Sequence, residues 1–197
     1  MKTIRPLLLA LCATLAFSVA RATTVIPPTF DQLVSQAQLI IDGTVTDVTS
    51  QWTGEGAQRH IVSYVTVKVA DTLKGDAGGP SYTLRMLGGT VGTETMEVSD
   101  SPKFQVGDRD ILFVENNGTQ FIPLVGIMHG RFHVAQDKQS GVDMVLADNG
   151  SAVTNVQSLG RIDETGAAKS GIDAVEKPLD VQSFKAAIRD QLAGSLK

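Results

Sequence analysis

Apolar residues recur at every second position in several segments of this chain, and this period of two constrains the fold more than any other feature. One such segment covers residues 61–73, where one face of an extended chain carries Ile61, Val65, Val67 and Val69. Successive side chains of a strand point to opposite faces, so the pattern predicts strands with one buried face. The other segments that we expect to form strands are 39–48, 82–86, 111–115, 120–134, 142–146 and 152–156.

The turns between these segments indicate how the strands pair. Asn116-Asn117-Gly118 and Asp148-Asn149-Gly150 are sequences typical of the tight turns of β-hairpins. Strands that are joined by such turns pair antiparallel. We therefore expect about seven antiparallel strands that form a barrel or a sandwich, and not a parallel sheet.

A helical period replaces the period of two at both ends of the expected sheet. Thr29 and Gln32 have the spacing of a capping box, which predicts a short N-terminal helix. Near the C-terminus, apolar residues recur at spacings of three and four, namely Val181, Phe184, Ile188 and Leu192. This stripe predicts an amphipathic helix over about 181–193, with Asp180 as its N-cap and Gly194 at its end. An isolated helix of this length is marginal in water, so we expect the stripe to pack on the β domain, with binding of a partner as the alternative.

The first 22 residues have the features of a secretory signal peptide. Lys2 and Arg5 precede an apolar run over residues 7–19, and Ala20 and Ala22 provide the small residues of a cleavage site. The run of about 13 residues is shorter than the roughly 20 that a membrane-spanning helix needs. We expect cleavage after Ala22 and a secreted or periplasmic protein that is not inserted in a membrane.

The composition of the expected mature chain, residues 23–197, excludes several kinds of chemistry. The single cysteine, Cys12, lies in the signal peptide, so disulfides, thiol catalysis and zinc sites with cysteine ligands are ruled out. Removal of the signal peptide leaves 14 Lys and Arg against 21 Asp and Glu. An acidic chain without a basic cluster is a poor partner for nucleic acid or an anionic membrane.

Composition also divides the mature chain into three parts. Residues 23–159 contain all the expected strands and form the predicted β-barrel domain. Residues 160–177 are rich in Gly, Ala, Asp, Ser and Lys without a clear period, which predicts a flexible linker. Residues 178–197 contain the expected C-terminal helix.

Few residues are candidates for catalysis or metal binding. His129 and His133 are four residues apart, but the pattern around them predicts a strand, in which their rings would be roughly 13 Å apart. One zinc ion cannot bind both rings at that distance, so we expect His129, Arg131 and His133 to form a solvated strand face. The acidic residues of the loop 90–108 are expected to be solvated as well. We therefore expect no catalytic residue, no metal and no cofactor, while a hydrolase that uses the His129–His133 region stays an alternative.

Two features are candidates for partner binding. Gly88 and Gly89 could present backbone N–H groups to a ligand, or they could form a flexible turn after the third expected strand. Trp52 is the only tryptophan. It could be a contact residue, because tryptophan is enriched at the centres of interfaces, or it could close one end of the core.

A series of small motifs resembles a known fold. The motifs are Phe30-x-x-Leu33-Val34, Gly43-x-Val45, Val65-x-Val67-x-Val69, Leu73-Lys74-Gly75, Gly88-Gly89, Phe104-x-x-Gly107-Asp108 and Ile111-Leu112-Phe113. Over residues 30–134 the chain resembles uncharacterised secreted bacterial proteins with an OB-like barrel. Its strand order is similar to that of the netrin-like domain of tissue inhibitors of metalloproteases. The resemblance implies an antiparallel OB-like barrel. In that inhibitor family an N-terminal Cys chelates the protease zinc, whereas here the expected N-terminus is Thr23, which becomes a further candidate for partner binding.

These observations predict a secreted, non-enzymatic binding module that recognises a protein or an extracellular polymer. Its fold is expected to be mainly β, an OB-like barrel with a short N-terminal helix and a C-terminal amphipathic helix. An inhibitor of a secreted metalloprotease and a hydrolase are the two alternatives.

Overall fold

The structure is a computed structural model that describes residues 26–138, 140–161 and 177–195. The expected signal peptide with its cleavage site after Ala22, the candidate Thr23 and most of the expected linker lie outside the described residues.

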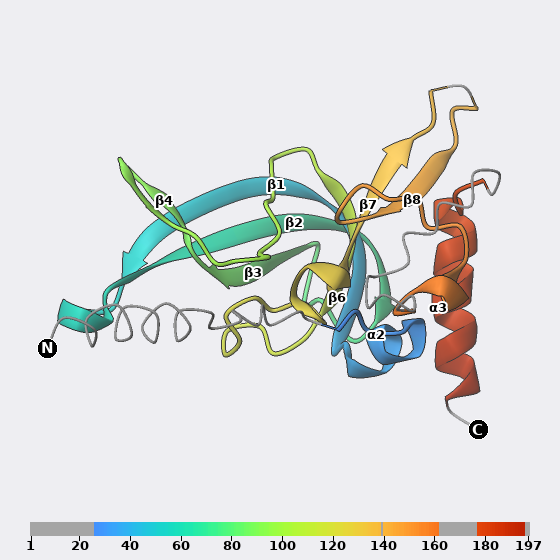
Figure 1. The fold of residues 1–197 in the computed structure, drawn as a ribbon, viewed down its shortest axis with the longest axis horizontal. Helices are drawn as coiled ribbons and strands as arrows, with labels where there is room; N and C mark the ends of the chain where they lie inside the picture. Colours follow the sequence, from blue (N-terminus) through green and yellow to red (C-terminus); the bar gives the residue numbers. More distant parts are fainter. Residues whose placement is uncertain (1–25, 139, 162–176, 196–197) are drawn as a thin grey trace, which may run out of the picture.

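The described residues form a mainly β fold, as the period of two predicts. Six antiparallel strands make one sheet in the spatial order β3-β2-β1-β6-β7-β8 (Figure 1). These strands are β1 (Leu39–Thr53), β2 (His60–Lys74), β3 (Ser81–Leu87), β6 (Arg109–Val114), β7 (Arg131–Gln136) and β8 (Asp143–Ala147). Two short strands, β4 (Gly89–Val91) and β5 (Glu94–Met96), pair in a separate ribbon within a connection that the sequence predicts as a loop. Two short 3-10 helices, η1 (Gly56–Gln58) and η3 (Val156–Ser158), complete the connections.

Two of the expected strands differ from the prediction. The segment 120–134 forms β7 only at its end, and residues 127–130 form the 3-10 helix η2 (Ile127–Gly130). A strand cannot continue through this segment because Pro123 has no N–H to donate and Gly126 takes a left-handed conformation with φ 62°. The segment 152–156 contributes a single bridge, between Ala152 and Leu146.

The sheet is not closed into the expected barrel. Its edge strands are β3 and β8, and each is covered by a different segment of the chain. At the edge of β3, the N–H of Leu87 donates to the carbonyl of Phe121. At the edge of β8, Met144 bridges to Asp180. These other segments use part of the hydrogen-bonding groups of the two edges, and the two edges do not pair with one another.

Both expected helices are present and pack on the sheet. The helix α2 (Phe30–Gln36) begins at Thr29 with the predicted capping box. The helix α3 (Val181–Gly194) begins at Asp180, whose side chain accepts a hydrogen bond from the N–H of Ser183. The apolar stripe of α3 packs into an apolar cluster, as predicted. Val181, Phe184 and Ile188 are buried there, and Leu192 is partly buried. No helix in the described parts of the chain has the length and apolar character needed to cross a membrane.

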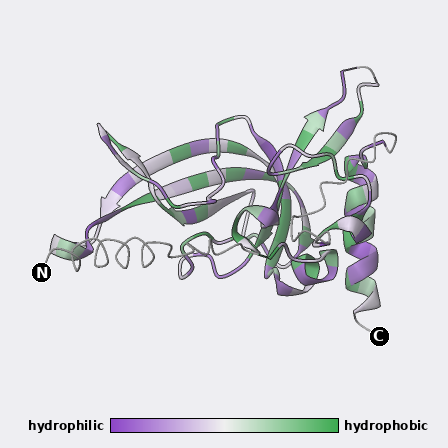
Figure 2. Cartoon of the chain, in the orientation of Figure 1, coloured by the Kyte–Doolittle hydropathy of each residue, from purple (hydrophilic) through white to green (hydrophobic). Residues whose placement is uncertain are grey.

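The sheet separates two apolar clusters. The cluster on the helix side contains Phe30, Phe113, Phe132 and Phe184, whose rings lie 5.0–6.4 Å apart in successive pairs. The cluster on the opposite side contains Ile41, Val65, Leu84, Phe104 and Leu112, among others. Figure 2 shows the alternation of polar and apolar residues along β1 and β2 that produces this division.

The strands β1 and β2 are much longer than the rest of the sheet. The pairing of β1 with β6 covers Leu39–Thr44, whereas its pairing with β2 continues to Thr53. The distal parts of β1 and β2, together with β3, form an arm of three strands (residues 45–53, 60–68 and 81–87) that extends away from the helices (Figure 1). The β4–β5 ribbon contacts β1 and β2 in this arm.

Candidate functional site

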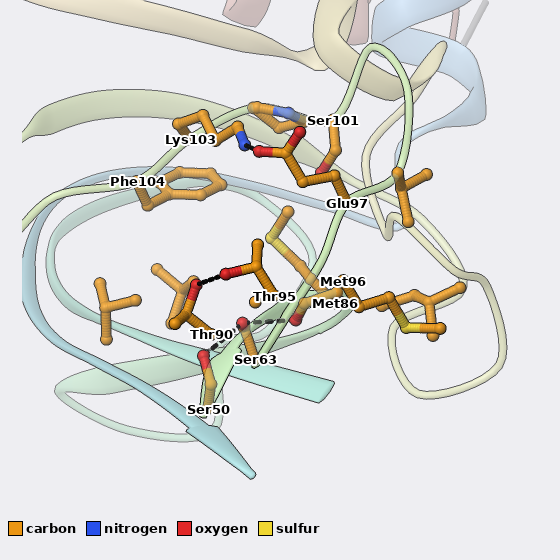
Figure 3. Close-up of a pocket in the computed structure, with 17 residues that line it drawn as sticks. Ser50, Ser63, Met86, Thr90, Thr95, Met96, Glu97, Ser101, Lys103 and Phe104 are labelled. Carbon is orange, nitrogen blue, oxygen red and sulfur yellow. Dashed lines mark hydrogen bonds and ion pairs between the residues drawn. The ribbon is translucent and has the colours of Figure 1, made fainter. Parts of the chain in front are cut away.

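A pocket of about 320 Å³ lies between the arm and the β4–β5 ribbon (Figure 3). One wall is the sheet face of the arm, and the other is the ribbon with the connection 97–104 that follows it. Its lining comprises Val48, Ser50, Ser63, Val65, Met86, Leu87, Gly88, Gly89, Thr90, Thr95, Met96, Glu97, Val98, Ser101, Pro102, Lys103 and Phe104. Val48 and Ser50 are two positions apart on β1, and Ser63 and Val65 are two positions apart on β2. Because side chains alternate along a strand, all four point to the same face of the arm.

Much of this lining is apolar. Val65, Met86 and Phe104 are buried, whereas Val48 at the rim is 36% exposed. The unbranched side chains of Met86 and Met96 are flexible and polarizable, so they can adapt to ligands of different shapes. Pockets that bind small groups combine apolar surface with polar groups that fix the orientation of the ligand, and this lining contains both.

Four of the five residues with hydroxyl groups in the lining form hydrogen bonds within the wall of the pocket. Ser63 Oγ donates to the carbonyl of Gly88 at 2.7 Å, and Ser50 Oγ lies 2.8 Å from Ser63 Oγ. Because Ser63 uses its single proton on the carbonyl, Ser50 is the donor between the two serines. On the ribbon, the hydroxyls of Thr90 and Thr95 lie 2.9 Å apart. The protons of both serines are therefore used within the wall, whereas one proton of the Thr90–Thr95 pair stays available to a ligand.

The two glycines that the sequence marks as candidates lie in this pocket, where they allow a close approach. Their backbone φ values are 96° at Gly88 and 131° at Gly89. A Cβ atom on Gly89 would lie 2.2 Å from Ser63 Oγ and 2.4 Å from Ser50 Oγ, so a side chain does not fit there. The N–H of Gly88 donates to the carbonyl of Ile61 and is not available to an anion.

The charged side chains of the lining neutralise one another. Lys103 Nζ lies 2.6 Å from Glu97 Oε1, and both side chains are largely exposed at the rim. The hydrogen bond from Lys103 lowers the pKa of Glu97 below its ordinary value. Because these two are the only charged residues that the described part of the chain contributes to the lining, its charges sum to zero there.

Trp52 lies near the tip of the arm and not in the pocket lining. Its ring is half-buried, and the guanidinium of Arg59 lies over it at 4.0 Å from the ring centre. Trp52 follows Ser50 by two positions on β1 and thus projects from the same face of the arm. The structure therefore brings Gly88 and Gly89 together in one site, and it places Trp52 on the same sheet face beyond that site.

The expected solvated face of His129, Arg131 and His133 is wrong for two of its three residues. His129 belongs to η2 and not to a strand, and its burial lowers its pKa below the ordinary value. Arg131 is 1% exposed. His133 lies on β7, as Arg131 does, but its side chain is partly exposed as predicted.

Arg131 is buried because carboxylates surround it. Its guanidinium lies 2.7 Å from Asp108 and 3.0 Å from Asp110, and it also donates to the carbonyl of Lys103. His133 Nδ1 lies 2.8 Å from the other oxygen of Asp110, and this contact raises the pKa of His133. The buried guanidinium is thus compensated by carboxylates within the protein.

A second charged cluster joins α3 to the sheet. Lys185 is buried, and its Nζ lies 3.0 Å from Asp42 on β1 and 2.7 Å from Asp71 on β2. Arg109 pairs with Asp42 and Asp143, which links β1, β6 and β8. Sequence reasoning missed both charged clusters, because the apolar pattern identifies buried faces but not the partners of a buried charge.

Sequence reasoning also missed most of the pocket. The motif Gly88-Gly89 indicated its position, and the alternation of Val48 with Ser50 and of Ser63 with Val65 was a usable signal for its sheet wall. The ribbon wall has no comparable periodicity. Among the described residues, no group of three or more His, Cys, Asp or Glu side chains is arranged to hold a metal ion. No family model, curated protein or solved structure matches the chain.

Proposed function

We propose that this protein is a secreted, non-enzymatic binding module, and that the pocket between the arm and the β4–β5 ribbon receives an apolar group of a protein partner. The observation that carries the proposal is the character of the lining. The protons of Ser50 and Ser63 are used within the wall and the two charges are paired, while apolar atoms make up slightly more than half of the lining surface. Secretion rests on the features of residues 1–22.

The same contacts favour binding over hydrolysis. A nucleophilic serine needs a base within hydrogen-bond reach, usually a histidine. Ser50 and Ser63 are bonded to one another and to a carbonyl, and the pocket lining contains no histidine. Of the two histidines of the hydrolase alternative, His133 faces Asp110 in the charged cluster around Arg131 and His129 lies in η2. An OB-like relationship of the open sheet is compatible with this proposal but is not needed for it.

A selection of peptides tests the proposal. A phage-displayed library of random linear dodecapeptides is selected on the wild-type chain, and the enriched peptides are titrated against two variants. Val48→Arg places a charge in the apolar mouth of the pocket. Thr49→Arg is the matched control, because the adjacent residue is also exposed but points to the opposite face of the arm.

We expect Val48→Arg to weaken the binding of the enriched peptides by about tenfold or more, equivalent to about 1.4 kcal/mol, while Thr49→Arg leaves the affinity nearly unchanged. Circular dichroism of both variants checks that they fold. Enrichment of no peptide, or an equal effect of both substitutions, would overturn the proposed function.

A further inference from the structure

We infer that the protein partner binds as an added strand along the free edge of β1, residues 47–53, and places one of its apolar side chains in the adjacent pocket. This inference rests on the proposed function, and it names how the partner is recognised. The free edge is defined as the side of residues 47–53 that faces away from β2.

The pairing of the sheet leaves this edge open. On one side, β1 pairs with β2 from Ile40 to Thr53, but on the other side β6 reaches only to Thr44. Val45 still exchanges backbone hydrogen bonds with Gly107 and Asp108. Beyond it, within the described residues, no backbone hydrogen bond joins residues 47–53 to any segment other than β2.

The hydrogen bonds of β2 show which groups point outward along the edge. The carbonyl of Ile61 accepts from Gly88 on the side of β3, so Ile61 does not exchange backbone bonds with its opposite residue, Trp52. Such pairs alternate with hydrogen-bonded pairs along an antiparallel ladder. The N–H and C=O groups of Val48, Ser50 and Trp52 therefore face away from β2, and those of the intervening residues face toward it.

A row of alternating N–H and C=O groups is complementary to another polypeptide backbone. Adding a strand to an exposed edge uses this complementarity, and pockets for alternate side chains then provide the specificity. A polysaccharide has no such regular series of amide groups. The edge therefore selects a protein over an extracellular polymer, the two partner classes that the sequence left open.

The edge lacks the features that usually protect exposed strands. Natural edges are blocked by charged side chains, proline or bulges. Here a bulge lies between Val45 and Asp47, and Asp47 is the one charged residue of the edge. The sequence that follows, residues 48–53, contains no charged residue and no proline, and its register with β2 is regular. This part of the edge can accept another strand.

The pocket lies beside this edge and on one face of it. Val48 and Ser50 belong both to the outward-facing series of the edge and to the pocket lining. Side chains of an added strand that point to this face would lie over the pocket, where an apolar one can enter. The uncharged residues 48–53 of the edge and the paired charges of Glu97 and Lys103 at the rim favour an uncharged, extended segment.

A second copy of this chain is a less suitable partner. If two copies paired antiparallel through this edge, the large apolar side chain available for the pocket would be Trp52. That ring is already half-buried and lies under Arg59 within its own chain. We therefore assign the edge to a different protein.

Two measurements test the added strand. First, an enriched peptide from the selection described above is synthesised with each backbone amide N-methylated in turn, which removes one N–H at a time. An added strand uses every second amide, so we expect alternate methylations to weaken binding by about tenfold or more and the others to have little effect.

Second, Ser50→Pro removes an outward-facing N–H, and Ser50→Ala is the matched control that loses the hydroxyl but keeps the N–H. Proline is tolerated on edge strands where the N–H side faces solvent. We expect Ser50→Pro to weaken binding strongly and Ser50→Ala to retain most of it. If Ser50→Pro does not fold, the periodicity of the N-methyl series decides the question.

The possible failures can be told apart. Peptides that depend on Val48 but show no period of two in the N-methyl series would overturn the added strand and leave the proposed function in place. If no enriched peptide depends on the pocket, both proposals are wrong. Self-association of the wild-type chain that Ser50→Pro abolishes would make a second copy the occupant of the edge and overturn our assignment to a different protein.

Discussion

At the scale of single residues, the structure depends on charges that are buried with their partners. Arg131 lies between Asp108 and Asp110, and Lys185 lies between Asp42 and Asp71. Removing one member of such a group leaves a buried charge without compensation, which is strongly destabilising. These residues are therefore fixed by their mutual contacts and are not free to act on a ligand.

His133 makes the free energy of unfolding depend on pH, and the direction of its pKa shift sets the sign of that dependence. Its contact with Asp110 raises its pKa above the ordinary value of about 6.5. A raised pKa in the folded state means that the stabilisation is fully present below pH 6.5 and is lost as the pH rises through the higher, folded-state value. We expect the difference in unfolding free energy between wild type and His133→Asn to shrink over that window.

Urea denaturation of both proteins at a series of pH values measures this difference. His129→Asn is an internal control of opposite sign, because burial lowers the pKa of His129 in the folded state. A difference between wild type and His133→Asn that stays constant from pH 5 to pH 9 would contradict the contact with Asp110.

At the scale of elements, α3 is held by one apolar face and one buried cation. Phe184 is fully buried among the rings of Phe30, Phe113 and Phe132. We expect Phe184→Ala to reduce the free energy of unfolding by about 3–5 kcal/mol, because it removes a large buried side chain and leaves a cavity. Leu192→Ala should cost less than about 2 kcal/mol, since Leu192 is only partly buried.

Gln182→Ala provides the reference for these substitutions, because Gln182 is exposed on the same helix and its replacement should change stability very little. Chemical denaturation of the three variants gives the comparison. Equal stability of Phe184→Ala and Gln182→Ala would show that α3 does not contribute to the core in solution.

The elements differ in how far the sequence predicts them. The stripe of α3 and the capping box of α2 are local signals, and both helices begin where these signals place them. The strand expected through residues 120–130 is absent, because Pro123 and Gly126 set the local conformation against the apolar pattern. The ribbon wall of the pocket and the contact of Lys185 with Asp42 depend on residues that are distant in sequence, and no local pattern records such pairings.

At the scale of the whole molecule, the structure combines a helix-covered sheet with an exposed arm. The helices pack on one side of the sheet at the end away from the arm, and the arm carries the ribbon on one face (Figure 1). The arm contains the pocket and the free edge of β1, side by side. In this arrangement the helix-covered part of the sheet anchors the arm, and the arm carries the surface that we assign to partner binding.

Hydrogen exchange, followed by NMR at individual amides with and without an enriched peptide, tests this assignment most directly. In the free protein the amides of Val48, Ser50 and Trp52 face away from β2, so they should exchange quickly, whereas those of Thr49 and Gln51 should be protected by the ladder. We predict that the bound peptide slows amide exchange at Val48, Ser50 and Trp52 and changes the exchange rates of Thr49 and Gln51 little. Unchanged exchange at these three amides in the saturated complex would contradict it.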